Sequence, residues 1–135
     1  MPLTIMQMIS PLIVAALIVA GCSLFKEPDR QNFSAILIAG AGAAYLSGGL
    51  GLWEFGFCAL LTGLAFFGLK HYWCLGIAWL MHTTWDIVHY RYGNPIVPFL
   101  PDSSAGCAIC DVGLAAWYFA GAPSIYALFG QRPLA

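Results

Sequence analysis

The sequence predicts an all-α integral membrane protein, a single domain built as a bundle of about five transmembrane helices. Three observations lead to this fold class. Of the 135 residues, 61% are hydrophobic and only 8% are charged, whereas a soluble domain carries about 25% charged residues. The hydrophobic residues fall in long runs separated by short polar clusters, which is typical of membrane helices. Strict alternation of apolar and polar residues is absent, which argues against a membrane β-barrel.

Each helix has to cross about 30 Å of hydrocarbon, which takes roughly 20 residues. Pro11 is expected to kink the first helix mildly, and Pro123 is expected to bend the fifth. Ser103 or Ser104 is expected to cap the fifth helix at its start. The third run is the shortest; the alternative for it is a re-entrant segment, which would leave four spans. The five expected spans are about 4–22, 33–51, 53–69, 72–91 and 104–129.

In the second expected span, small residues recur every four positions, at Gly40, Ala44 and Gly48. Such a row lets another helix approach closely. Because five short helices enclose little interior of their own, we expect a homo-oligomer that forms through this small-residue face.

The lysine and arginine residues predict an orientation. With five spans, Arg91 is the one basic residue on its side of the membrane. The positive-inside rule makes the side with more basic residues cytoplasmic. We therefore expect the N-terminus outside and the C-terminus inside, in a bacterial inner membrane. The basic residues on the cytoplasmic side would be Lys26, Arg30, Lys70 and Arg132.

An alternative interpretation of the N-terminal region starts from VAGC at 19–22, which resembles the cleavage site of a bacterial lipoprotein. Cleavage there would leave Cys22 as a lipid-bearing N-terminus. The preceding MPLTIMQ has no basic residue, which such a signal normally contains. The membrane bundle is therefore the favoured interpretation.

Residues 81–91, MHTTWDIVHYR, place ionisable side chains inside one of the most apolar parts of the chain. At about 100° per residue, Asp86 lies about 40° from His82 and His89 lies about 20° to the other side. The three residues therefore share one narrow stripe of the fourth helix. Ionisable groups at membrane depth are costly and normally face the interior of a bundle, so we expect the stripe to face other helices.

The fifth span has a matching polar face, on which Cys107, Cys110 and Asp111 fall within about 100° of each other. At 1.5 Å per residue, Asp86 and Asp111 both lie on the order of 8–10 Å below the outer surface. The stripe of the fourth helix is therefore expected to face Asp111 and Cys107 across a pocket that opens outward between the fourth and fifth spans.

The residues around this expected pocket are typical ligands of a divalent transition metal, namely zinc, iron or manganese. A site with two histidines, a carboxylate and an open position would activate water or oxygen. Two alternatives stay open: the groups hydrogen-bond one another for structural reasons only, or they carry out acid–base chemistry without a metal. The candidate metal ligands are His82, Asp86, His89, Asp111 and Cys107, and the candidate catalytic residues are His82, Asp86, His89 and Asp111.

Three nearby residues are candidates for substrate binding. Arg91, at the mouth of the pocket, would hold an anionic headgroup or extend to the membrane interface. Trp85 would form a wall, and Glu54, between the second and third spans, would add an acidic group. A membrane lipid or an isoprenoid-like molecule that enters from the bilayer is the expected substrate. Five scattered basic residues leave no footprint of nucleic-acid binding.

The first alternative to a metal-dependent membrane enzyme is a thiol oxidoreductase that passes electrons to a quinone. Cys107 and Cys110 form a C-x-x-C near the start of a helix, where the helix dipole favours a thiolate. Such enzymes need a second cysteine pair, which Cys22, Cys58 and Cys74 do not form. Inert cysteines in a non-catalytic lipid-binding or accessory subunit are the other alternative.

The run HTTWDIVHYRYGNPIVPF, followed by SSAGCAICD, resembles a small bacterial integral-membrane family of unknown function. The pattern of that family is H-x-x-W-D-x-x-H, then a Gly-x-Pro loop, then a helix that carries cysteine and aspartate. The resemblance covers roughly the second half of the chain. It implies that the site is a shared feature and leaves the activity open. The matching positions are His82, Trp85, Asp86, His89, Gly93, Pro95, Cys107 and Asp111.

Overall fold

The computed structural model describes residues 3–46 and 48–130, and in these two ranges the chain forms six helices and no strand. The expectation of an all-α fold is therefore confirmed. Arg132, which contributed to the expected orientation, lies outside the described residues. The helices are α1 (Ile5–Ser23), α2 (Asp29–Ala41), α3 (Trp53–Gly68), α4 (Tyr72–Arg91), α5 (Ser103–Phe119) and the short α6 (Ile125–Leu128).

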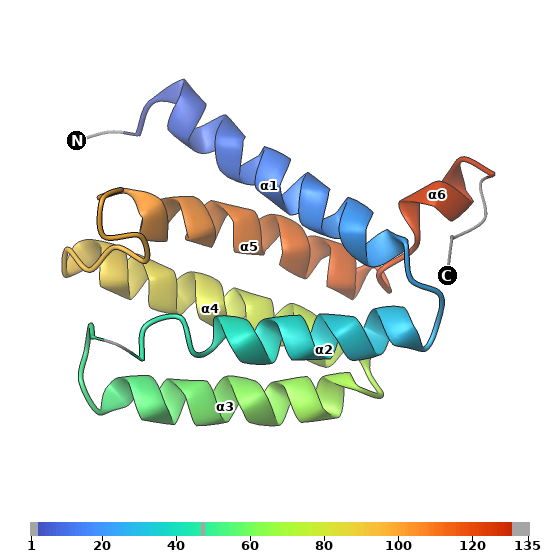
Figure 1. The fold of residues 1–135 in the computed structure, drawn as a ribbon, viewed down its shortest axis with the longest axis horizontal. Coiled ribbons are helices and arrows are strands. Elements are labelled where there is room, and N and C mark those ends of the chain that lie inside the picture. The colour runs from blue at the N-terminus through green and yellow to red at the C-terminus, as the bar shows by residue number, and fades with distance from the viewer. Residues whose placement is uncertain (1–2, 47, 131–135) are drawn as a thin grey trace.

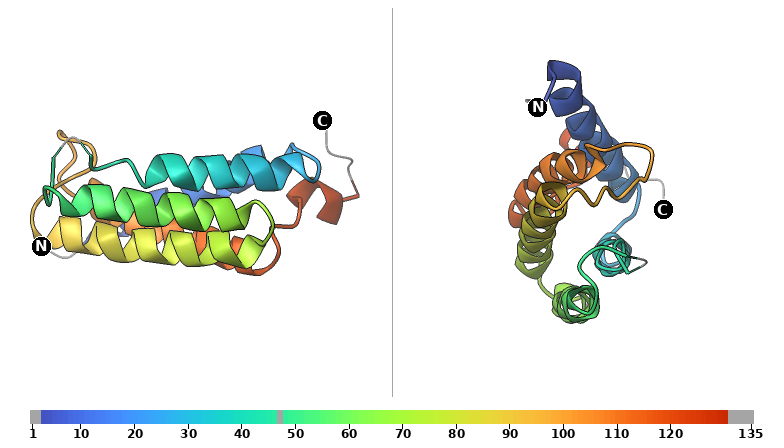
Figure 2. Two further views of the ribbon diagram at one scale, coloured as in Figure 1. Left: turned by 90° about the horizontal axis from the view of Figure 1, so that it is seen from below. Right: turned by 90° about the vertical axis from the view of Figure 1, so that its left-hand side faces the viewer.

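The first five helices run alternately in opposite directions along one axis (Figure 1). One end of the bundle holds the start of α1 and the connections from α2 to α3 and from α4 to α5; we call it the distal end. Seen end-on, α1, α5, α4 and α3 form a curved row, and α2 lies on its concave side (Figure 2). The most extensive contact between helices is that of α4 with α5, so residues on their facing sides are brought together.

Three helices, α1, α3 and α4, begin and end within one residue of the ranges expected from the sequence. The start of α1 is fixed by a capping box in which Thr4 and Gln7 satisfy each other's backbone N–H groups. Among the described helices, α1 is the one with both the length and the apolar composition of a membrane span, with a mean hydropathy of 2.2. Helix α3 is also apolar but shorter.

The second helix differs from the expected range 33–51, since α2 begins at Asp29 and ends at Ala41. Beyond Gly42 the chain turns, and Gly49 and Gly51 adopt φ angles of 77° and 65°, which a helix does not allow. Ala44 therefore lies in a turn, outside the helix that carries Gly40. The expected row of small residues is not one helical face, and the proposed contact for a homo-oligomer loses its geometric basis.

The fifth helix was expected to bend near Pro123 and to continue to residue 129. In the structure α5 ends earlier, at Phe119. Gly121 and Ala122 both have positive φ angles, of 84° and 48°, and Pro123 follows them. A proline disfavours helical geometry in the residue before it, so the chain stops α5 and resumes with α6. At the other end of α5, the N-cap residue is Asp102, which makes no side-chain capping hydrogen bond to the helix, so the expected serine cap is wrong.

The interior of the bundle combines close helix contacts with aromatic packing. A Cβ atom placed on Gly76 of α4 would stand 2.9 Å from the ring of Phe119 on α5. Leu75, Leu114 and Tyr118 are fully buried around this contact. Glycine at this position therefore leaves room for the ring of Phe119, which is 49% exposed, against α4.

Candidate functional site

The polar stripe of α4 faces the interior of the bundle, as expected. His82 is 3% exposed, and Asp86 and His89 are both fully buried. From α5, Asp111 points into the same region and is 3% exposed. Burial of four ionisable side chains is expensive unless they have partners, so the contacts of these groups define the site.

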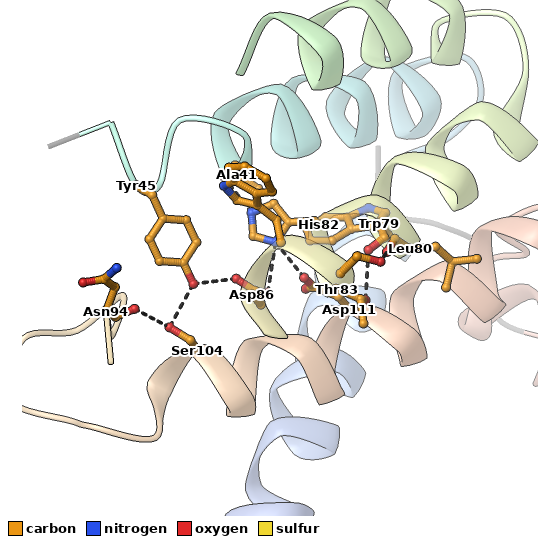
Figure 3. A network of polar contacts seen from close by, with 12 residues as sticks. Ala41, Tyr45, Trp79, Leu80, His82, Thr83, Asp86, Asn94, Ser104 and Asp111 are labelled. Atoms are coloured by element: carbon orange, nitrogen blue, oxygen red, sulfur yellow. Dashed lines mark hydrogen bonds and ion pairs between the residues drawn. The ribbon is translucent and has the colours of Figure 1, made fainter. Parts of the chain in front are cut away.

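His82, Asp86 and Asp111 form one compact centre between α4 and α5 (Figure 3). His82 Nδ1 lies 2.8 Å from Asp111 Oδ2 and 3.1 Å from Asp86 Oδ2. Among the described residues, this is the one group of histidine, cysteine, aspartate or glutamate side chains that offers three ligand atoms within 4.8 Å of one another. Two carboxylate oxygens therefore converge on a single imidazole nitrogen.

The other imidazole nitrogen of this centre is held by the backbone. His82 Nε2 lies 2.9 Å from the carbonyl oxygen of Ala41, the last residue of α2. A carbonyl oxygen only accepts hydrogen bonds, so Nε2 carries a hydrogen and donates it. The ring is thereby fixed with Nδ1 directed at the two carboxylates.

Tyr45, in the turns after α2, completes the centre and was not anticipated from the sequence. Its hydroxyl oxygen lies 2.6 Å from Asp86 Oδ1, to which it donates, and 2.9 Å from Ser104 Oγ. Ser104 in turn donates to the carbonyl oxygen of Asn94, at 2.9 Å. Figure 3 shows this chain of contacts from Asp86 to Asn94. A tyrosine among glycines and alanines was the one available sign of it in the sequence.

His89 belongs to a second buried pair, with Glu54 at the start of α3. His89 Nε2 lies 2.9 Å from Glu54 Oε1, and the two side chains are 0% and 2% exposed. The same carboxylate accepts hydrogen bonds from the backbone N–H of Leu50, at 2.8 Å, and from Trp85 Nε1, at 2.9 Å. The pair lies outside the group of three converging side chains, and Trp85 donates a hydrogen bond to Glu54 inside the bundle.

Tyr45 connects the two buried groups. Its ring stacks on the imidazole of His89, with centroids 3.5 Å apart and planes 3° from parallel, while its hydroxyl binds Asp86. One side chain from outside α4 thus contacts both polar positions of α4.

The remaining candidate residues lie outside these contacts. Cys107 is half-buried and Cys110 is buried, and both thiols are free. Neither belongs to the group of three converging ligand atoms in the described part of the chain. Arg91 is exposed. The structure thus brings together His82, Asp86 and Asp111, while His89 and Cys107 do not join them.

Access to the centre differs from the expected outward-opening pocket between α4 and α5. The three converging side chains are buried, and Tyr45 covers Asp86 from the distal end. A pocket of about 330 Å³ lies there, and Tyr45 forms part of its wall. Its lining residues are Ala44, Tyr45, Gly48, Gly49, Asn94, Pro95, Ile96 and Pro98.

Comparison with known protein families identifies the family of this chain. The profile of a family described as "Family of unknown function (DUF6010)" matches residues 6–124, which includes α1 to α5 and every residue of the centre. The chain belongs to this family. No curated protein and no solved structure matches the chain significantly. Membership of an uncharacterised family agrees with the resemblance noted in the sequence and leaves the function to be argued from the site.

Proposed function

We propose that the protein is an integral membrane enzyme that binds a divalent transition metal at His82, Asp86 and Asp111 and acts on a lipid-like substrate. The observation that carries the proposal is the convergence of two carboxylate oxygens on one nitrogen of an imidazole whose other nitrogen is held by a backbone carbonyl.

The distribution of side chains supports a membrane setting. Large apolar residues are exposed on all the long helices, for example Leu17 at 67%, Phe66 at 69% and Trp73 at 56%. The buried set, in contrast, contains five ionisable side chains from the middle and distal parts of the bundle. Apolar residues outside and polar residues inside is the arrangement that hydrocarbon favours. The five are Glu54, His82, Asp86, His89 and Asp111.

Basic residues support an orientation in that membrane. Lys26, Arg30 and Lys70 lie at the end opposite the distal end, whereas Arg91 lies at the distal end itself. By the positive-inside rule the distal end faces outward, with the N-terminus outside.

The geometry of the centre fits a metal ion of about the size of zinc. The three ligand atoms lie within 4.8 Å of one another. Two atoms that share a tetrahedral ion with bonds of about 2.1 Å stand about 3.4 Å apart. The two separations from His82 Nδ1 are 2.8 and 3.1 Å, so a small outward movement of the carboxylates would admit the ion. A second shell that fixes the histidine through its other N–H is also typical of metal sites. Here Ala41 provides that contact.

Charge supports the same assignment. Asp86 and Asp111 bring two negative charges into a buried space with one imidazole. A divalent cation bound to neutral His82 and two carboxylates gives a centre without net charge, which lowers the cost of burial. Zinc, iron and manganese all accept this combination of nitrogen and oxygen ligands.

Three protein ligands would leave one coordination position of the metal open for water or substrate. In that position the metal would activate water or polarise a substrate oxygen. His82, Asp86 and Asp111 would hold the ion, and Tyr45 would hold Asp86. His89, oriented by Glu54, is the remaining buried imidazole for proton transfer. The apolar surroundings and the pocket at the distal end, where lipid headgroups would lie, favour a lipid-like substrate.

Elemental analysis of the purified protein tests the proposal. We expect about one zinc, iron or manganese ion per chain in the wild-type protein, since the described residues contain one such group of ligands. The ion should be lost in His82→Ala and Asp111→Asn. His71→Ala is the matched control, because His71 is exposed at the other end of α4. Metal-free wild-type protein after supplementation, or retention of the ion by both site variants, would refute the assignment.

A further inference from the structure

The pocket at the distal end is next to the centre but separate from it. It lies between the turns that follow α2 and the loop that follows α4, with a volume of about 330 Å³. Pockets that hold small ligands start at about 300 Å³, so it has room for a headgroup.

Hydrogen bonds link the pocket wall to the centre. Tyr45 and Asn94 both line the pocket, and both contact Ser104. Tyr45 also binds Asp86. A molecule in the pocket would therefore lie one side chain away from a candidate metal ligand.

The electrostatic surroundings of the pocket disfavour a charged ligand. None of its described lining residues is charged. Carboxylates stand directly behind two of them: Asp86 behind Tyr45, and Glu54 behind Gly49, where a Cβ atom would come within 2.5 Å of Oε1. An anionic group in the pocket would find no cation among the described lining residues. Each acid behind the wall already has a histidine partner, His82 or His89, so a cationic ligand gains little from either carboxylate.

The polar groups of the described lining residues are neutral. Tyr45 contributes a hydroxyl and Asn94 a carboxamide, and each of these groups can donate and accept hydrogen bonds. A ligand hydroxyl, which also both donates and accepts, suits such a surface.

We propose that this pocket binds the neutral, hydroxyl-bearing headgroup of a lipid, of the kind found in diacylglycerol. The inference rests on the lipid-like substrate of the proposed function and narrows it to neutral headgroups. In this proposal the free hydroxyl of the lipid lies beside Tyr45, and Tyr45 therefore contacts both the headgroup and Asp86.

Lipid retention tests this assignment. The protein is reconstituted in phosphatidylcholine nanodiscs that contain equal amounts of diacylglycerol and phosphatidic acid, and the lipids that stay bound are identified by native mass spectrometry. We expect the wild-type protein to retain diacylglycerol. Ala44→Trp should lose most of it, because Ala44 is exposed and its new ring would fill the pocket. Pro98→Trp repeats the test from the opposite wall. Ala127→Trp, on the exposed side of α6, is the control.

Retention of diacylglycerol by both pocket variants, or a preference of the wild-type protein for phosphatidic acid, would overturn the proposal. Metal content is measured on the same samples, which separates the two hypotheses. Bound diacylglycerol without metal would contradict the metal centre and uphold the pocket. Bound metal without retained diacylglycerol would contradict the pocket alone.

Discussion

The hydroxyl oxygen of Tyr45 lies 2.6 Å from Oδ1 of Asp86, although Tyr45 stands in a turn and Asp86 in the middle of a helix 41 residues further along the chain. This contact leaves Asp86 Oδ2 free to face His82. The orientation of the carboxylate, and with it the shape of the candidate metal centre, therefore depends on a segment outside α4 and α5.

Tyr45→Phe removes that contact and keeps the ring that stacks on His89. We expect the free energy of unfolding to fall by about 1–3 kcal/mol, because a buried carboxylate loses a hydrogen-bond donor. The measurement is unfolding in detergent micelles, with Tyr126→Phe in α6 as the control. Metal affinity should fall by about 10–100-fold as well, which is typical when a ligand loses its second-shell partner. Equal affinity in Tyr45→Phe would show that Asp86 is oriented without the tyrosine.

Hydrophobic runs were sufficient to predict three of the helices closely. The ranges of α1, α3 and α4 follow from long, predominantly apolar runs that turns or polar residues bound, although α4 also carries the stripe of ionisable residues. The second helix was misplaced because hydropathy does not distinguish an apolar helix from an apolar turn. AGAAYLSGGLG has no charged residue and reads as part of a hydrophobic run, yet the helix stops at Ala41. The turns that follow lead to Gly49 and Gly51, whose positive φ angles do not fit a helix. At Pro123 the residues before the proline close the helix completely instead of bending it.

The site was partly predictable for a similar reason. Helical periodicity placed His82 and Asp86 on one face, and equal depth placed Asp111 opposite them. Periodicity treats each helix alone, so it assigned His89 to the same centre. In the structure, His89 pairs instead with Glu54, at the start of α3. Tyr45 was missed because its position depends on the turns after α2, which no periodic pattern describes.

Gly49 is predicted to be a position where alanine is strongly destabilising. Its φ angle is 77°, and an added Cβ would come within 2.5 Å of both Glu54 Oε1 and His89 Cε1. Gly51→Ala is the matched control, because Gly51 has a φ of 65° but open space around it. We expect Gly51→Ala to cost on the order of 1 kcal/mol for the backbone alone. Gly49→Ala should cost clearly more in the same unfolding assay. Equal losses of stability in Gly49→Ala and Gly51→Ala would mean that the Glu54–His89 pair moves aside without an energetic cost.

Cys107→Ser is predicted to leave the metal content of the protein unchanged, because the thiol lies outside the three converging ligand atoms of the described residues. The measurement is elemental analysis beside His82→Ala. Loss of the ion from Cys107→Ser would instead make this cysteine a fourth ligand. The same variant addresses thiol chemistry, since a redox pair with Cys110 requires both sulfurs.

The last prediction concerns the contact between α4 and α5, the two helices that carry the aspartates of the centre. Gly76→Ala would place a methyl group 2.9 Å from the Phe119 ring, so the helices must separate or the ring must turn. Overpacking in a well-packed core costs about 1–3 kcal/mol. Because Phe119 is 49% exposed and its ring has room to turn, we expect a cost at or below the low end of that range. Gly63 in α3 is the matched control, because nothing lies within 4 Å of its added Cβ. Gly63→Ala should stabilise the helix by up to about 1 kcal/mol. If separation of the helices reaches Asp86 and Asp111, metal affinity will fall in Gly76→Ala and stay unchanged in Gly63→Ala. A loss of stability at unchanged affinity would show that the Phe119 ring absorbs the methyl group locally.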